Sequence, residues 1–150
     1  MQLILWRHAE AEDGTPDLER ALTAKGLKQA DKMAAFLRAR LPAETRILAS
    51  PARRTQQTVQ ALTSEYLTVP ALAPTASAQE LLSAVDWPQA GGCVLVVGHQ
   101  PTLGEVAAQL LATAGNGFSI KKGAVWWLTG KEDEGDYLVR LKLVIGPESL

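Results

Sequence analysis

The chain contains two histidines, and each lies where an apolar run ends. His8 follows Arg7 after the run over residues 2–6, and His99 lies just beyond the run over residues 93–97. A neutral imidazole can form a covalent intermediate, and an imidazole N–H can stabilise charge that develops on an oxygen. Two histidines in matching positions therefore indicate one catalytic site to which both contribute.

Arginines occupy the same kind of position. Arg7 lies at the end of the first apolar run, and Arg54 follows the short run over residues 46–49. A guanidinium presents planar paired donors that suit a tetrahedral oxyanion. The residues therefore predict a pocket for a phosphate-sized dianion. Arg53 is expected to be a solvated neighbour of this pocket, and Arg20 is equally compatible with a ligand and with a surface residue.

Phosphate held beside a histidine predicts covalent catalysis. His8 is expected to attack phosphorus, since nearby cations disfavour the imidazolium and keep the nucleophile unprotonated. His99 is expected to stabilise charge on the equatorial oxygens. A zinc site made by His8, His99 and Glu10 is the competing interpretation. Arg7 and Arg54 argue against it because they would repel a metal cation, so no metal is expected.

Strands and helices alternate along the chain and must position these residues. Buried strands are expected over residues 2–6, 46–49, 68–69 and 93–98, helices over 24–41, 52–66, 79–85 and 101–113, and a closing hairpin over 124–128 and 137–145. Ser50 is expected to cap the second helix, with Pro51 as its first residue. Helix N-termini after Pro51 and Pro101 would favour an anion.

This pattern predicts a single domain over residues 1–150 with an α/β fold. The expected architecture is a three-layer α/β/α sandwich around a mixed, mostly parallel sheet. The carboxyl ends of parallel strands share one edge, so the histidines and arginines are expected to meet there. The helix over 24–41 is expected to bury Leu27, and the strand over 137–145 to alternate strictly, with residues 130–136 forming the turn.

Composition limits the partners. The formal net charge is −1 and the calculated pI is 6.1, which give no support for bulk attraction to nucleic acid or to an anionic membrane. The single cysteine, Cys93, excludes an internal disulfide and is expected to be a small core residue. No apolar run is long enough to span a bilayer, and a strand that starts at residue 2 leaves no room for a signal peptide. A cytoplasmic monomer is expected.

Four segments carry a family resemblance. Leu5-Trp6-Arg7-His8-Ala9-Glu10 resembles the Arg-His signature that opens the histidine phosphatase (phosphoglycerate-mutase-like) superfamily, with Ala9 where most members have glycine. The segment over residues 50–58 resembles the block Ser-Pro-x-x-Arg-x-x-x-Thr, and Val97-Gly98-His99-Gln100-Pro101 resembles the third block. Residues 20–26 resemble the Arg-x-Leu-Thr-x-x-Gly segment of the small SixA-type branch.

The resemblance implies specific roles. His8 would be the phosphorylated nucleophile, and Arg7, Arg54 and His99 would complete the phosphate pocket. Arg20 would be an accessory residue. Glu10 is a further candidate for substrate binding, to which the resemblance assigns no role. A phosphoglycerate mutase-like fold without a metal or an organic cofactor is implied as well.

One departure from the family bears on the substrate. Larger members carry a general acid in a Pro-Glu-type segment, whereas Ala71 stands at the nearest equivalent here and leaves only Glu10 and Glu80 as candidates. An imidazole leaves far more easily than an alcohol, so the missing acid favours a phosphohistidine substrate. The expected function is a phosphohistidine phosphatase acting on a phosphohistidine-containing protein. A phosphatase of small phosphate esters and a non-catalytic phosphate-binding adaptor are the alternatives.

Overall fold

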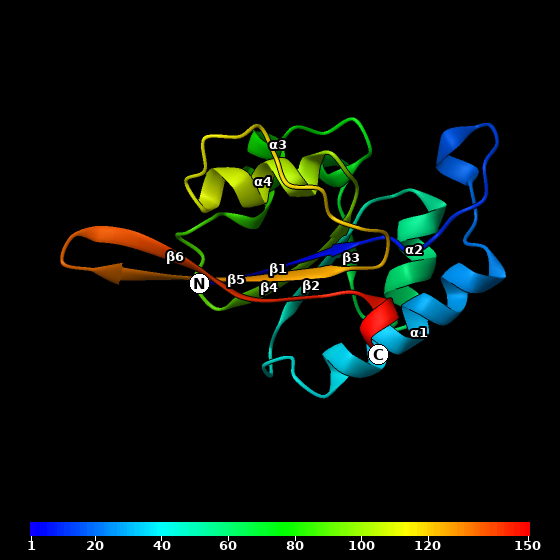
Figure 1. Cartoon of the computed structure of the whole chain (residues 1–150), viewed down its shortest axis with the longest axis horizontal. Coiled ribbons are helices and arrows are strands. Elements are labelled where there is room, and N and C mark those ends of the chain that lie inside the picture. The colour runs from blue at the N-terminus through cyan, green and yellow to red at the C-terminus, as the bar shows by residue number, and fades with distance from the viewer.

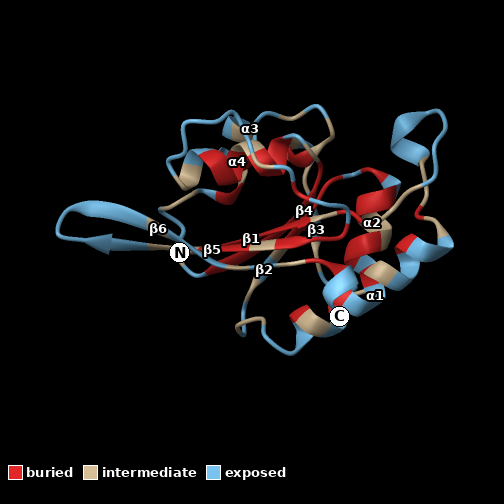
Figure 2. Ribbon diagram, in the orientation of Figure 1, coloured by how far each residue is buried: buried red, intermediate tan, exposed pale blue.

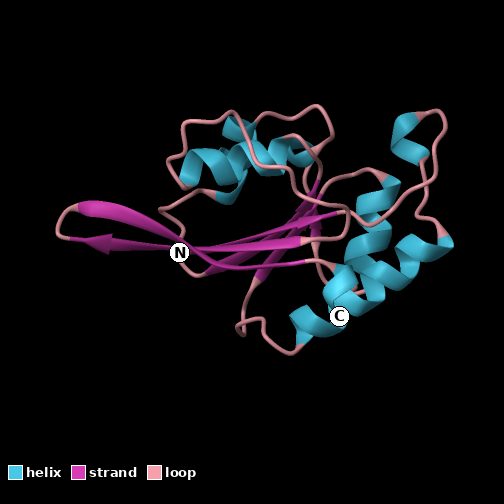
Figure 3. Ribbon diagram, viewed as in Figure 1, coloured by secondary structure: helices cyan, strands magenta, loops and turns pink.

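A six-stranded sheet lies between two layers of helices in the structure, a computed structural model that describes all residues from Met1 to Leu150 (Figures 1 and 3). The strands are β1 Gln2–Arg7, β2 Arg46–Ala49, β3 Leu67–Thr68, β4 Cys93–Gly98, β5 Val125–Asp133 and β6 Asp136–Ile145. Their spatial order is β3-β2-β4-β1-β5-β6. The first four run parallel, and β5 and β6 close the sheet as antiparallel partners. The predicted mixed, mostly parallel sheet is confirmed.

Helices cover both faces of this sheet. They are α1 Ala24–Arg38, α2 Arg53–Gln60, α3 Ala78–Val85 and α4 Thr102–Leu110, with short 3-10 turns η1 Asp17–Glu19, η2 Pro70–Leu72 and η3 Pro147–Ser149. Apolar residues of α3 and α4 pack on one face, and those of α1 and α2 pack on the other (Figure 2). The central strand β4 is buried along its whole length, including Cys93. No helix has both the length and the apolar character needed to cross a membrane.

The register of the central strands decides where the polar residues meet. In the parallel pairing, Arg7 lies opposite Gly98 and Ala49 lies opposite Val97. The chain therefore leaves β1, β2 and β4 at the same carboxyl edge of the sheet. The segment that carries η1 stands out beside this edge, at the upper right of Figure 1.

Three of the four helices, α1, α2 and α4, are shorter than their patterns predict, whereas α3 matches its expected range to within one residue. Helix α1 ends at Arg38, and Leu27 is 46% exposed although its spacing predicted burial. Gly26 takes the contact position on the inner face instead, directly against the backbone of Glu10. Helix α2 begins at Arg53 with Ala52 as its N-cap, so Pro51 lies outside the helix. It also stops at Gln60, six residues before the predicted end at residue 66, and the chain then turns into β3.

The closing hairpin is longer than predicted, because residues 130–133 continue β5 and do not form a turn. Only Glu134 and Gly135 connect the strands, with φ angles of 50° and 88°. Positive φ at both central residues is typical of a type I′ turn, whose twist matches that of the strands it joins. The polar composition of this segment therefore reflects two exposed strand ends that project beyond the body of the protein (Figure 2).

The predicted strict alternation of β6 is wrong at one point. Trp127 pairs with Leu143, but the next residue of β5, Leu128, pairs with Leu141, so Lys142 is an extra residue on β6. Such a bulge flips the faces of the side chains beyond it. Val139 accordingly packs toward α3 and α4, whereas Leu143 packs toward α1 and α2.

We predict that the contact made by Gly26 stabilises the fold measurably. A Cβ at this position would collide with the carbonyl oxygen of Glu10. Gly26→Ala should lower the free energy of unfolding by about 1–3 kcal/mol in urea titrations, because overpacking outweighs the helix propensity of alanine. Gly115→Ala is the matched control, since nothing lies within 4 Å of its added Cβ. Equal stability of the two variants would contradict the prediction.

Candidate active site

The carboxyl edge of the sheet brings both histidines together, as the sequence predicted. The ring centroids of His8 and His99 lie 5.3 Å apart, with the ring planes tilted by 55°. Both side chains are almost fully buried. Arg7 arrives on the end of β1, and Arg54 reaches the same place from the first turn of α2.

The geometry around His8 leaves one ring nitrogen free to act as a nucleophile. Its Nδ1 lies 2.7 Å from the carbonyl oxygen of Ala9. A carbonyl can only accept, so Nδ1 carries the proton of the neutral ring and Nε2 carries the lone pair. Burial is the main cause that lowers the pKa of His8 from 6.5 to about 4, and the charges of Arg54 and Arg7 act in the same direction. The hydrogen bond to Ala9 opposes this shift only in part.

We therefore expect His8 to stay neutral well below pH 6.5. An NMR titration of the protein labelled with ¹⁵N in its two histidine rings should place the midpoint of His8 near pH 4. The free energy of unfolding should also fall as the pH drops from 6.5 toward 4, because the histidines bind protons in this pH range in the unfolded chain but not in the folded chain. Urea titrations at pH 7 and pH 5 measure this loss. A midpoint near 6.5 would contradict the prediction.

The two arginines bind different backbone segments, and each has a buried Nε–H that is left without a partner. Arg7 donates from Nη1 to the carbonyl oxygen of Ile120 at 2.8 Å. Arg54 donates from Nη1 to the carbonyl oxygen of Asp17 at 2.9 Å and from Nη2 to Oδ2 of Asp17 at 3.1 Å. The Nε atoms of both arginines are buried and have no hydrogen-bond partner.

His99 contributes a third buried nitrogen that has no hydrogen-bond partner. Its Nε2 lies 2.8 Å from Oγ of Ser50, and its Nδ1 is buried without a partner. Burial is the main cause that lowers the pKa of His99 to about 3, followed by the charge of His8. The two arginine Nε atoms and His99 Nδ1 are all the buried side-chain nitrogen and oxygen atoms in the protein that lack a partner. Buried polar groups are rarely left unpaired, so their grouping in one place marks a binding site.

The structure adds a residue that the sequence interpretation missed. Asp17, in η1, accepts from Arg20 through Oδ1 at 3.1 Å and from Arg54 through Oδ2 at 3.1 Å. The hydrogen bond from Arg20 lowers the pKa of Asp17 most, followed by the hydrogen bond from Arg54. Arg20 therefore contacts the pocket through Asp17. The only sequence signal was the spacing of three residues between Asp17 and Arg20, which is common in short helical turns.

Glu10 and Glu80 have structural partners of their own. The Glu10 carboxylate accepts from the Thr23 hydroxyl at 2.8 Å, beside the start of α1. Glu80 forms a capping box with Ser77 at the start of α3. No three His, Cys, Asp or Glu side chains come together as a metal-binding group. Asp17 is the one carboxylate that touches an arginine beside the histidines.

Arg53 and Gly98 are the sequence neighbours of the pocket residues Arg54 and His99. Arg53 is exposed, as predicted. A Cβ added at Gly98 would meet the Leu103 side chain at 3.3 Å. The small size of Gly98 therefore serves the packing of α4 against β4.

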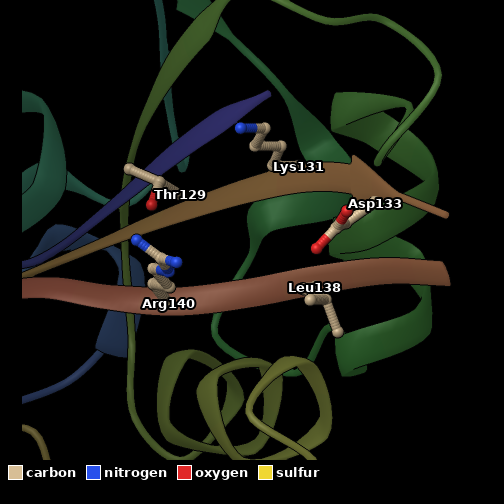
Figure 4. A pocket seen from close by; sticks show the side chains of 5 residues that line it. All are labelled: Thr129, Lys131, Asp133, Leu138 and Arg140. Atoms are coloured by element: carbon tan, nitrogen blue, oxygen red, sulfur yellow. The ribbon is translucent and has the colours of Figure 1, made fainter.

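A separate surface hollow lies on the projecting hairpin. Its lining residues are Thr129, Lys131 and Asp133 of β5 with Leu138 and Arg140 of β6 (Figure 4). Gln2 lies opposite Thr129 in the pairing of β1 with β5, so this hollow is beyond the amino ends of the parallel strands. It therefore lies at the edge of the sheet opposite the histidines.

Comparison with known proteins identifies relatives over most of the chain. The family model described as histidine phosphatase superfamily (branch 1) matches residues 3–74. An uncharacterised protein of Mycobacterium tuberculosis is 31% identical over 125 residues, which cover 76% of this chain and 75% of the relative.

Solved structures match over almost the full length. The protein histidine phosphatase SixA complexed with tungstate matches with a TM-score of 0.81 at 23% identity, and the match covers 99% of this chain and 99% of that one. A presumed phosphohistidine phosphatase SixA from Nakamurella multipartitia has a TM-score of 0.80 at 28% identity, over 97% of this chain and 95% of that one. A phosphoserine phosphatase from Entamoeba histolytica has a TM-score of 0.75 at 16% identity, over 99% and 98%. The similarities below 25% identity concern the fold.

Proposed function

The chain belongs to the histidine phosphatase superfamily, and from this premise we propose that it removes phosphate from a phosphohistidine of another protein through a covalent intermediate on His8. The observation that carries the proposal is the set of three buried nitrogens without partners, Nε of Arg7, Nε of Arg54 and Nδ1 of His99. They lie beside the one imidazole whose Nε2 keeps a free lone pair. A phosphoryl group would give these nitrogens the acceptors that they lack.

The reaction follows from the roles of these groups. Nε2 of His8 attacks phosphorus, a bond forms between this nitrogen and phosphorus, and the bond from phosphorus to the substrate imidazole breaks. The imidazole departs with its electron pair and takes a proton from solvent. Water then attacks phospho-His8, which releases inorganic phosphate and restores the neutral ring. The guanidiniums stabilise the charge on the equatorial oxygens in both steps.

The acid–base groups of the pocket support a phosphoramidate substrate. Arg20 and Arg54 hold the pKa of Asp17 low, so this carboxylate is ionised near neutral pH and has no proton to donate to a leaving group. Both histidines are neutral in the same range. An alkoxide would leave poorly without a proton donor, whereas an imidazole leaves readily. Because phosphohistidine is a side chain of a protein, a phosphohistidine substrate implies that the partner is another protein.

Hydrolysis of small phosphate esters is the second candidate, because a phosphoserine phosphatase shares the fold. The deciding experiment compares kcat/KM for a phosphohistidine-containing phosphocarrier protein with kcat/KM for a library of phosphate monoesters. We expect the phosphohistidine protein to be preferred by at least about tenfold, which corresponds to about 1.4 kcal/mol. Preference for an ester would reassign the substrate. Tight phosphate binding without turnover of either class would indicate a binding adaptor.

Asp17 should weaken the binding of inorganic phosphate. Its charge opposes a dianion, and it occupies the Nη donors of Arg54. Asp17→Asn removes the charge and keeps an acceptor, so we expect phosphate to bind about 3- to 10-fold more tightly, as measured by calorimetry. Asp13→Asn is the matched control, because this exposed carboxylate lies 4.0 Å from Arg20 and contacts neither Arg54 nor a histidine. Weaker phosphate binding by Asp17→Asn would contradict the prediction.

A further inference from the structure

Ser50 is fully buried at the point where β2 leads toward α2. Its backbone N–H donates to the carbonyl oxygen of Val97 at 3.1 Å, which ties it to the neighbouring strand β4. Its hydroxyl has two neighbours. Oγ accepts from the backbone N–H of Ala52 at 3.2 Å and lies 2.8 Å from Nε2 of His99.

These two contacts determine the direction of the second hydrogen bond. A buried hydroxyl proton requires an acceptor. The N–H of Ala52 can only donate, so Nε2 of His99 is the one acceptor within hydrogen-bond reach of Ser50 Oγ. The hydroxyl must therefore donate to Nε2. The reverse direction would leave the hydroxyl proton buried and unpaired, which is unfavourable because a buried donor loses its hydrogen bonds to water without gaining a partner.

We propose that Ser50 is a positioning residue that holds His99 in the tautomer with its proton on Nδ1, so that Nδ1–H donates to a phosphoryl oxygen. In this tautomer all three unpartnered nitrogens of the pocket are donors: Nε–H of Arg7, Nε–H of Arg54 and Nδ1–H of His99. The opposite tautomer would turn a lone pair toward an oxyanion and repel it. The part of this inference that concerns catalysis rests on the proposed function, whereas the tautomer itself does not.

The two histidines then share one tautomer and use opposite ends of the ring. The carbonyl of Ala9 binds Nδ1–H of His8 and leaves the Nε2 lone pair for phosphorus. Ser50 binds the Nε2 lone pair of His99 and leaves Nδ1–H for oxygen. A hydroxyl that donates to Nε2 also disfavours a second proton on His99, which keeps the ring neutral. The low pKa of His99 agrees with this arrangement.

The test reads the tautomer directly. The protein labelled with ¹⁵N in its histidine rings gives signals from only two imidazoles, and His8→Ala assigns those of His99. Long-range ¹H–¹⁵N correlation spectra of the full chain near neutral pH should show a protonated Nδ1 and an unprotonated Nε2 for His99. A protonated Nε2 in the wild-type protein would overturn the proposal without any measurement of activity.

Variants connect the tautomer to catalysis. Ser50→Ala should move His99 toward the Nε2–H tautomer and lower kcat by about 10- to 100-fold with a smaller change in KM, since a donor to the developing charge is misplaced. Ser50→Thr keeps the hydroxyl and should restore both the spectrum and kcat in large part. Ser83→Ala, an exposed serine of α3, is the control. An Nδ1–H tautomer that persists in Ser50→Ala would overturn the proposal. If phosphohistidine is not turned over but the tautomer depends on Ser50, the proposed function fails and the positioning role holds.

Discussion

Replacing His8 with alanine should lower turnover of a phosphohistidine protein by about 10⁴-fold or more, because the variant has no group that can form the covalent intermediate. The remaining pocket keeps Arg7, Arg54 and His99 and can still bind phosphate. We therefore expect His8→Ala to bind inorganic phosphate or tungstate with an affinity within about tenfold of the wild type. Single-turnover kinetics measure the first quantity, and calorimetry measures the second.

The intermediate itself can be trapped. When the wild-type protein reacts with a ³²P-labelled phosphohistidine substrate and is quenched in base, the label should appear on the peptide that contains His8. His99→Ala is the matched variant, since it removes the other imidazole but leaves the nucleophile. It should still become labelled, at a lower rate. Label on His99, or substantial turnover by His8→Ala, would contradict the covalent role of His8.

Replacing Arg54 with lysine should lower kcat/KM by about 10²- to 10³-fold, although the positive charge is retained. Three nitrogens of the guanidinium have separate tasks: Nη1 and Nη2 bind Asp17, and Nε is the buried donor beside the histidines. A lysine ammonium has one nitrogen and cannot reproduce this geometry. A loss of this size would therefore show that the reaction needs the planar set of guanidinium donors and not only the positive charge.

Arg53→Lys provides the control for this substitution. Arg53 is the preceding residue of α2 and is exposed, whereas Arg54 is buried. We expect kcat/KM of Arg53→Lys to stay within about twofold of the wild type, as for most exposed substitutions away from a site. Similar losses for the two variants would show that general positive charge, and not the buried fork of Arg54, supports the reaction.

Asp17 gives the pocket a negative charge, which the histidines and arginines alone would not supply. Its carboxylate neutralises part of the charge of Arg20 and Arg54, and the segment that carries it stands out beside the sheet edge (Figure 1). A pocket made only of cations would hold the product phosphate more firmly. The expected effect of Asp17→Asn on phosphate affinity follows from this balance.

Much of the site was predictable from the sequence, because its main residues follow directly from strand ends. The apolar runs before His8 and His99 are long enough to identify buried parallel strands, and parallel strands bring their carboxyl ends to one edge. The place of Arg54, shortly after the run over residues 46–49, follows from the same rule. The superfamily signature could be read from the same segments, whereas the mixed sheet was predicted from the closing hairpin over residues 124–128 and 137–145.

Features that depend on side-chain direction could not be predicted in this way. The sequence indicated a hairpin at the end of the chain, but the bulge at Lys142, which decides the face on which Leu143 packs, depends on a register between two strands. The exposure of Leu27 depends on how closely Gly26 approaches a segment 16 residues away in the chain, at Glu10.

The sequence by itself therefore determined which groups meet: two imidazoles and two guanidiniums at the carboxyl edge of a parallel sheet. Only the tertiary structure decided how they are paired. Asp17 reaches Arg54 across 37 positions of the chain, and Ser50 reaches His99 across 49. Hydrogen bonds between such distant residues depend on angles and distances of a few tenths of an ångström, which local patterns do not encode. Those bonds determine which nitrogens remain free to act on phosphate.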